Sequence, residues 1–229
     1  MKLTTALILA GGKGERMRPI TYEIPKPMLP VQGKPILAHQ IEVLKKNGID
    51  RVILSLGYLQ KKISSHFGYG SKFGVRINYV VESKPLGTAG PIRLAKKYLK
   101  DSFAAMNGDT LIDIDLQALY EFHRKQRTPA TIALVKAEKA SASGLVGLRD
   151  GKIESFTEKP KSGSGLINAG VYVFEPEIVR HIPRGRSMLE KDVFPKLAGK
   201  GVLSGMVVNA KMFDVGTLEG YAKAIKGWK

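Results

Sequence analysis

Short apolar runs alternate with amphipathic stretches along most of this chain. The runs have the length of strands and most are apolar on both faces, which predicts β-strands near residues 4–10, 51–56, 75–81, 103–106, 130–137 and 167–174. Between them, apolar residues recur at helical spacing, which predicts helices over residues 35–47, 88–99 and 115–126. This alternation favours an α/β fold with a doubly wound, mainly parallel, Rossmann-like sheet in three layers, α/β/α.

The same pattern indicates how the chain is organised. No stretch has the composition of a linker and no internal repeat occurs, so we interpret residues 1–229 as a single domain. The apolar runs are far shorter than the roughly 20 residues of a membrane helix, and the N-terminus has the pattern of a strand rather than a signal peptide. We therefore expect a soluble, cytoplasmic protein with no membrane partner.

Composition narrows the possible chemistry. The chain has no cysteine, which excludes disulfides, thiolate metal ligands and a cysteine nucleophile. Its formal charge of +17 indicates an anionic partner. The cations are scattered over the polar ends of the predicted helices, and no basic tract interleaved with aromatic residues occurs, so we expect no nucleic-acid partner. Small polyanions remain as candidate ligands.

The first predicted strand leads directly into a glycine-rich loop. Glycines at positions 11, 12 and 14 allow backbone N–H groups to approach an anion, while Lys13, Arg16 and Arg18 supply positive charge. The spacing matches neither the Walker loop nor the dinucleotide-binding fingerprint. The loop therefore predicts a phosphate site of another type, with an unliganded strand-to-helix turn as the alternative.

Further candidate residues follow the other predicted strands, whose carboxyl ends meet at one edge of a parallel sheet. Lys26 lies among prolines in Pro-Lys-Pro-Met-Leu-Pro, and Asp109 ends Asn-Gly-Asp after the fourth strand. Other blocks occupy residues 82–90, 158–160, 168–170 and 213–217. In this order, the blocks between Leu7 and Thr217 resemble those of the sugar-1-phosphate nucleotidyltransferases, also called nucleotide-sugar pyrophosphorylases. Residues 86–91, 167–170 and 190–195 look most similar to mannose-1-phosphate guanylyltransferases.

The resemblance implies transfer of a nucleoside monophosphate from a nucleoside triphosphate to a sugar 1-phosphate, with release of pyrophosphate. It implies Mg²⁺ as cofactor and leaves a homo-oligomer possible. The residues that it assigns are Arg16 and Lys26 for catalysis, Asp109 and Asp214 for the metal, Leu9, Ala10, Gly11, Gly12, Lys13, Gly14, Glu82 and Gly87 for the nucleotide, and Gly144, Glu158, Lys159 and Asn168 for the sugar phosphate. The alternative for Asp214 is a turn-forming aspartate before Gly216.

The substrates are less sharply defined than the reaction. A carboxylate at Glu82 can accept two bonds from the N1 and N2 edge of guanine, which favours GTP. The resemblance implies mannose 1-phosphate as the acceptor. A heptose-1-phosphate guanylyltransferase and a uridylyl- or thymidylyltransferase acting on N-acetylmuramate or glucose 1-phosphate remain alternatives. So does an inactive nucleotide-binding regulatory subunit. A glycosyltransferase would use Asp113-Ile114-Asp115 as a metal motif, although that segment also fits a helix N-cap.

Overall fold

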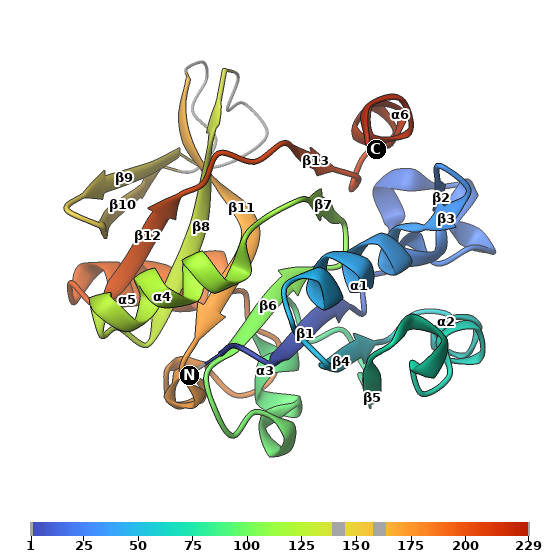
Figure 1. Ribbon diagram of the computed structural model, residues 1–229, viewed down its shortest axis with the longest axis horizontal. Coiled ribbons are helices and arrows are strands. Elements are labelled where there is room, and N and C mark those ends of the chain that lie inside the picture. The colour runs from blue at the N-terminus through green and yellow to red at the C-terminus, as the bar shows by residue number, and fades with distance from the viewer. Residues whose placement is uncertain (1, 139–144, 158–163, 229) are drawn as a thin grey trace.

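A nine-stranded sheet forms the centre of the computed structural model, which describes residues 2–138, 145–157 and 164–228 (Figure 1). The strand order is β5-β4-β1-β6-β11-β8-β12-β10-β9. These strands are β1 (Thr5–Ala10), β4 (Arg51–Leu56), β5 (Arg76–Val81), β6 (Phe103–Asn107), β8 (Ala130–Ala137), β9 (Leu145–Arg149), β10 (Lys152–Thr157), β11 (Gly165–Phe174) and β12 (Leu203–Val207). Two small ribbons pair β2 (Pro30–Val31) with β3 (Lys34–Pro35), and β7 (Thr110–Ile112) with β13 (Met212–Asp214).

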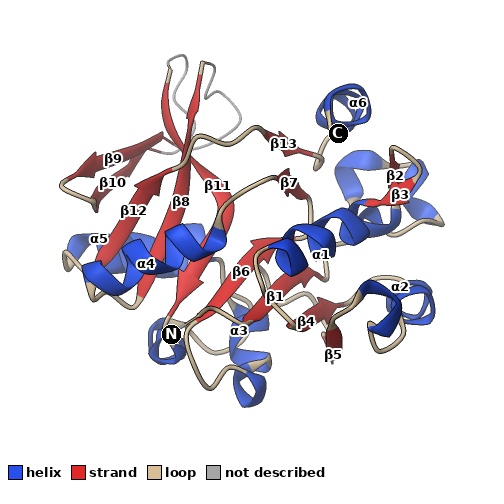
Figure 2. Ribbon diagram, in the orientation of Figure 1, coloured by secondary structure: helices blue, strands red, loops and turns tan. Residues whose placement is uncertain are grey.

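Helices cover both faces of the sheet (Figure 2). They are α1 (Ile36–Lys46), α2 (Gln60–Phe67), α3 (Gly90–Leu94), α4 (Leu116–Gln126), α5 (Phe194–Gly199) and α6 (Leu218–Gly227). Alternate side chains of each central strand enter different apolar clusters, as Ala6 and Ile8 of β1 do on one side and Leu7 on the other. One cluster contains residues of α1, α2 and α4, and the other contains residues of α3 and α5. The predicted three-layer α/β fold is therefore confirmed.

The sheet differs from the prediction in strand direction. The neighbours β5, β4, β1 and β6 are parallel, as expected, but β11 runs antiparallel to both β6 and β8. Strand β10 is likewise antiparallel to β12 and β9. The sheet is thus mixed, with a parallel half that carries the glycine loop. A buried apolar run has the same appearance whichever way the strand runs, so the sequence pattern did not reveal these reversals.

The predicted helix boundaries hold at α1 and α4 and fail at residues 88–99. Pro35 precedes α1 and Asn47 follows it, in agreement with the sequence signals. The segment 88–99 instead contains the short α3 and a 3₁₀ turn, Lys96–Tyr98. Three strands (β9, β10 and β12), the two ribbons and the helices α2, α5 and α6 were not predicted, because most are short and carry weak periodicity.

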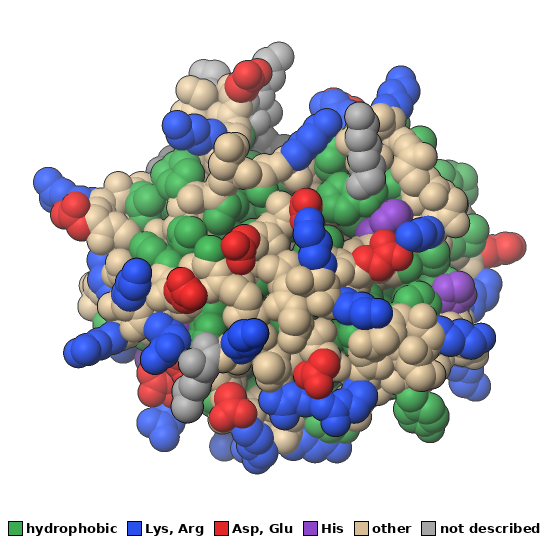
Figure 3. Space-filling model, in the orientation of Figure 1, with side chains coloured by type: hydrophobic (Ala, Val, Ile, Leu, Met, Phe, Trp, Pro, Cys, Tyr) green, Lys and Arg blue, Asp and Glu red, His purple; other side chains and the backbone are tan. Residues whose placement is uncertain are grey.

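Two further features are the distribution of charged side chains on the surface and the length of the helices. Lys and Arg side chains are spread over the face seen in Figure 3 and do not gather in one patch. Within the described parts of the chain, none of the helices combines the length and the apolar character needed to span a bilayer.

Candidate active site

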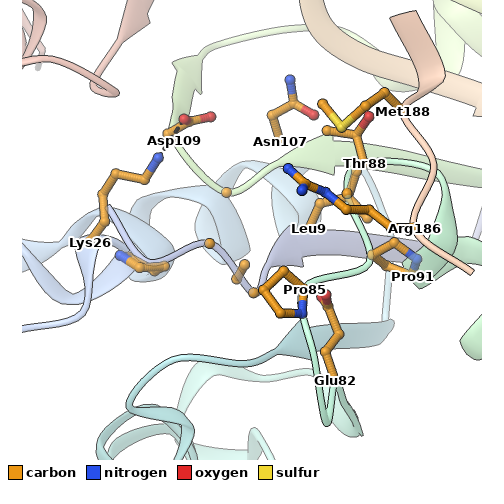
Figure 4. A pocket seen from close by; sticks show the side chains of 16 residues that line it. Leu9, Lys26, Glu82, Pro85, Thr88, Pro91, Asn107, Asp109, Arg186 and Met188 are labelled. Atoms are coloured by element: carbon orange, nitrogen blue, oxygen red, sulfur yellow. Dashed lines mark hydrogen bonds and ion pairs between the residues drawn. The ribbon is translucent and has the colours of Figure 1, made fainter. Parts of the chain in front are cut away.

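A cleft of about 320 Å³ opens at the carboxyl ends of β1 and β6 (Figure 4). Its volume lies in the range of small-molecule sites, roughly 300–1,000 Å³. Many of the residues predicted from the sequence line it: Leu9, Ala10, Gly11, Gly12, Lys26, Glu82, Gly87 and Asp109. An adjoining hollow is lined by Gly11, Gly12, Lys13, Gly14, Glu15, Arg16, Lys26 and Gly216, among others. The two hollows share the glycine loop and Lys26, so the predicted phosphate loop lies between them.

The glycine loop turns into a single 3₁₀ turn, Glu15–Met17. The Thr21 hydroxyl donates to the Gly14 carbonyl at 2.8 Å and fixes the end of the loop. Glu15 is an acidic residue beside a cationic loop, and its carboxylate lies 3.7 Å from the Arg18 guanidinium at the surface. Glu15 therefore pairs with Arg18 in solvent. Arg16 lines the hollow.

Four charged side chains from distant segments meet beside this loop. Lys26 Nζ lies 2.5 Å from Asp109 Oδ2, and both side chains are largely buried, with exposed fractions of 14% and 23%. A Cβ atom added to Gly216 would lie 2.7 Å from Arg16 Nη2, 2.8 Å from Asp214 Oδ1 and 3.1 Å from Asp109 Oδ2. The predicted metal carboxylates and the predicted catalytic cations therefore surround one point.

The β7–β13 ribbon brings Asp109 and Asp214 together. Asp214 pairs with Thr110, the residue after Asp109, and the Val215 N–H donates to the Asp109 carbonyl at 2.8 Å. Asp214 Oδ1 also accepts the Gly216 N–H at 2.8 Å, so the alternative role of Asp214 as a turn residue is present in the structure. That bond uses one oxygen, and a carboxylate can accept further ligands.

The carboxylate pair fits a hard divalent cation. Asp109 and Asp214 supply oxygen ligands, the type that Mg²⁺ prefers. No cluster of three or more His, Cys, Asp or Glu side chains suited to a metal occurs in residues 2–138, 145–157 and 164–228. A cation held here would therefore need oxygen atoms from substrate and water as well, which is the usual manner of Mg²⁺ binding.

Glu82 lies on the opposite side of the cleft from Asp109 (Figure 4). Its carboxylate accepts the Ser55 hydroxyl on Oε1 and the Leu86 N–H on Oε2, each at 3.0 Å. A side chain at Gly11 would collide with this carboxylate, so the glycine loop passes directly over it. Burial raises the pKa of Glu82, although the bonds from Leu86 and Ser55 oppose that effect.

Gly87 connects the Glu82 turn to a second segment of the cleft wall. Its φ of +79° is the left-handed conformation that glycine adopts readily, and a Cβ atom would collide with the Ser187 carbonyl. The Ser187 N–H donates to Leu86 O at 2.9 Å, and the Ala89 N–H donates to Ser187 O at 3.0 Å. Two backbone bonds therefore clamp the turn to the segment around Ser187.

The predicted sugar-phosphate residues are only partly described. Gly144, Glu158 and Lys159 lie outside the described residues. Asn168 lies on β11, where its amide nitrogen donates to the Tyr172 hydroxyl and its oxygen accepts the Gly170 N–H. Asn168 is not among the described residues that line the cleft.

Sequence reasoning missed Arg186, which lines both hollows and is exposed. Figure 4 shows its side chain directed into the cleft from the segment that the Gly87 turn holds. The only sequence signal was an Arg-Gly-Arg loop at residues 184–186, about one hundred residues from the Glu82 turn. Thr88 and Met188 also line the cleft from these two segments.

The proposed glycosyltransferase metal motif has a structural role instead. Asp115 caps α4 by accepting the Ala118 N–H at 2.9 Å, and Asp113 pairs with Lys46 at 3.1 Å. The N-cap interpretation of this segment is confirmed.

The fold is the α/β fold of the nucleotidyltransferases. The chain belongs to the nucleotidyl transferase family, whose model matches residues 5–228. It is 38% identical over 242 residues to a UTP–glucose-1-phosphate uridylyltransferase of Synechocystis sp., covering 97% of this chain and 62% of that protein. It is 39% identical over 224 residues to a mannose-1-phosphate guanylyltransferase of Mycobacterium tuberculosis, covering 95% of this chain and 62% of that protein. The chain thus spans less than two thirds of the length of these curated relatives.

A solved structure extends the likeness to three dimensions. The crystal structure of HddC from Yersinia pseudotuberculosis complexed with GMP-PN has a TM-score of 0.87 and 32% identity to this chain. The alignment covers 99% of this chain and all of the other.

Proposed function

We propose that this protein is a sugar-1-phosphate nucleotidyltransferase, which transfers a nucleoside monophosphate to a sugar 1-phosphate and releases pyrophosphate. The observation that carries the proposal is the meeting of Arg16, Lys26, Asp109 and Asp214 beside the glycine loop. Family membership and the names of the relatives support the same reaction class.

Charge explains why the reaction needs this arrangement. Both substrates are polyanions, and an oxygen of the sugar phosphate must approach the α-phosphorus opposite the leaving pyrophosphate. Positioning and charge neutralisation supply most of the catalysis in such transfers. We assign the triphosphate to the backbone N–H groups of residues 11–14, with Arg16 on the charge that develops at the α-phosphate and Lys26 beside the phosphates. Arg186, at the rim of both hollows, adds a further cation.

We assign Mg²⁺ to Asp109 and Asp214, whose oxygens lie around the same point beside Gly216. The bound ion would neutralise phosphate charge as the bond to pyrophosphate breaks. Lys26 already contacts Asp109, so it lies where it can bridge the carboxylate and an incoming phosphate. On the sugar side we retain Glu158 and Lys159 as candidates, both from outside the described residues, whereas Asn168 does not line the cleft.

We propose GTP as the preferred nucleotide and mannose 1-phosphate as the preferred acceptor. Glu82 supports GTP, because it lines the cleft and each of its oxygens has a second lone pair for the N1–H and N2–H of guanine. Guanylyltransferases and a uridylyltransferase both occur among the relatives. Heptose, N-acetylmuramate and glucose 1-phosphates therefore remain acceptors to be tested, as UTP and dTTP remain donors.

The experiment is a matrix of four nucleoside triphosphates against mannose, glucose, heptose and N-acetylmuramate 1-phosphates, followed by pyrophosphate release. We expect release to require both substrates and a divalent cation, and to be fastest with GTP. Nucleotide binding without pyrophosphate release in any combination would identify an inactive nucleotide-binding subunit. Release of nucleoside diphosphate from an added nucleotide sugar would identify a glycosyltransferase.

A further inference from the structure

Behind the strand tip that carries Asp109 lies a buried polar cluster of Asn107, Asn168 and Tyr172. Asn107 ends β6, and the other two lie on the antiparallel neighbour β11. The Tyr172 side chain is fully buried and its hydroxyl accepts from Asn168 Nδ2 at 3.0 Å. Burial raises the pKa of Tyr172 well above its usual range, so the hydroxyl stays protonated and neutral. The cluster is therefore a set of neutral groups held by packing.

A bulge in β11 presses this cluster against Asn107. The register between β11 and β8 shifts between Asn168 and Tyr172, and Gly170 within the bulge has a φ of +69°. A Cβ atom at Gly170 would lie 2.9 Å from Asn107 Nδ2, so only glycine lets the backbone come this close. The nitrogen end of the Asn107 amide thus faces β11.

The oxygen end of the same amide has no hydrogen-bond partner among the residues that the structure describes. Asn107 Oδ1 is buried without a hydrogen bond to any of the described residues, although Asn107 lines the cleft. Leaving a buried acceptor unsatisfied is unfavourable by about 1–3 kcal/mol, so such atoms call for an explanation. Asn107 and Asp109 lie on one side of the cleft and Glu82 on the other (Figure 4). A donor that satisfies Oδ1 therefore comes from the part of a ligand remote from the Glu82 end.

We propose that Asn107 Oδ1 accepts a hydrogen bond from a sugar hydroxyl of the substrates, and that Tyr172 and Asn168 are positioning residues that hold the acceptor toward the cleft. The inference rests on the proposed function, which brings two sources of sugar hydroxyls, the ribose and the sugar 1-phosphate. Phosphate oxygens are largely deprotonated at neutral pH, so the hydroxyls are the main donors that this part of the substrates brings. Oδ1 has almost no solvent-accessible surface, so binding of the hydroxyl requires a small movement of the Asn107 amide or of the cleft wall beside it.

The test compares each substrate with its deoxy analogue in several variants. GTP is compared with 2′-deoxy- and 3′-deoxy-GTP, and mannose 1-phosphate with its monodeoxy analogues, by kcat/KM. Calorimetric titration with the triphosphates gives the ribose comparison without turnover. The ratio of the hydroxyl substrate to its analogue is taken within each variant, so a uniform change of rate cancels.

We expect the unaltered protein to prefer one hydroxyl substrate over its analogue by about 5- to 30-fold, the value of one hydrogen bond. Asn107→Ala should remove that preference for this hydroxyl alone, while Asn107→Asp, which keeps an oxygen at the position, should retain it. Tyr172→Phe should reduce the preference without changing the ratios for the other hydroxyls. If Asn107→Ala does not fold, the Asn107→Asp and Tyr172→Phe ratios decide the question.

Ratios that are the same in the variants as in the unaltered protein, for every hydroxyl, would overturn the inference. So would a loss in Tyr172→Phe that is equal for all substrates, because that indicates a purely structural role. Failure of the proposed function gives a different result, since the unaltered protein would then release no pyrophosphate with any substrate pair. A preference found with the GTP analogues identifies a ribose hydroxyl as the donor, and one found with the mannose 1-phosphate analogues identifies a hydroxyl of the sugar phosphate.

Discussion

Replacement of Glu82 by glutamine tests whether this residue reads the nucleobase. Its two oxygens are already held by the Ser55 hydroxyl and the Leu86 N–H. A glutamine can keep its oxygen on the fixed Leu86 donor and turn its NH₂ toward Ser55, whose hydroxyl also accepts. We therefore expect Glu82→Gln to fold. The amide should keep the orientation of the carboxylate, and only the oxygen beside Ser55 is replaced by a donor.

The magnitude follows from the bond that is lost. Guanine presents N–H donors at N1 and N2, so the new NH₂ faces a donor and a charge-assisted bond becomes a neutral one. Together these changes should weaken GTP use by about 2–3 kcal/mol, a fall of about 30- to 150-fold in kcat/KM. Uracil and thymine offer a single imino N–H, so UTP and dTTP should change far less or improve.

The assay is pyrophosphate release with GTP, UTP and dTTP under identical conditions. Ser55→Ala is the matched control, because it removes one support of the carboxylate and leaves both oxygens as acceptors. We expect the control to affect all three nucleotides alike. An equal fall for every nucleotide in Glu82→Gln would mean that Glu82 supports the loop instead of reading the base. A preference of the unaltered protein for UTP or dTTP would end the guanylyltransferase proposal.

Three further predictions concern the metal site, the clamp and a buried histidine. Asp109→Asn and Asp214→Asn should each abolish turnover, and the double variant should cost little more than either, because residues that act as a unit are not additive; near-normal activity in either would remove it from the site. Gly87→Ala should destabilise the fold in urea clearly more than Gly33→Ala, whose similar φ of +78° costs about 1 kcal/mol with no atom within 4 Å of the new Cβ; equal losses would refute the close-contact argument. Burial lowers the pKa of His123 despite the opposing effect of a neighbouring carboxylate, so the unfolded chain binds more protons there. Stability should therefore fall as pH drops below about 6.5, by at most about 1.4 kcal/mol per pH unit, and His123→Gln should flatten this slope in urea titrations; an unchanged slope would contradict the assignment.

Local patterns determined a large part of this architecture. Apolar runs of strand length located β1, β4, β5, β6, β8 and β11, because the burial of these strands, on both faces except at the edge strand β5, leaves a signal within a few residues. Turn and capping residues located α1 and α4, because these signals also lie within a few residues of the helix ends. The glycine loop and the motif containing Asp109 follow strands, and the carboxyl ends of parallel strands meet at one edge, so the sequence alone predicts that the two lie together.

Tertiary structure decided what depends on contacts between distant segments. Asp214 reaches Asp109 through the three-residue ribbon β7–β13, which is too short to produce a periodic signal. Arg186 enters the cleft because Ser187 is clamped to the Gly87 turn. The unpaired oxygen of Asn107 depends on a bulge in β11, more than sixty residues away. The sequence by itself thus determined the elements and the chemistry available at their ends, since both are encoded locally. Only the folded chain decided strand direction and the contacts that bring the charges of the site together, because these depend on pairing across long separations.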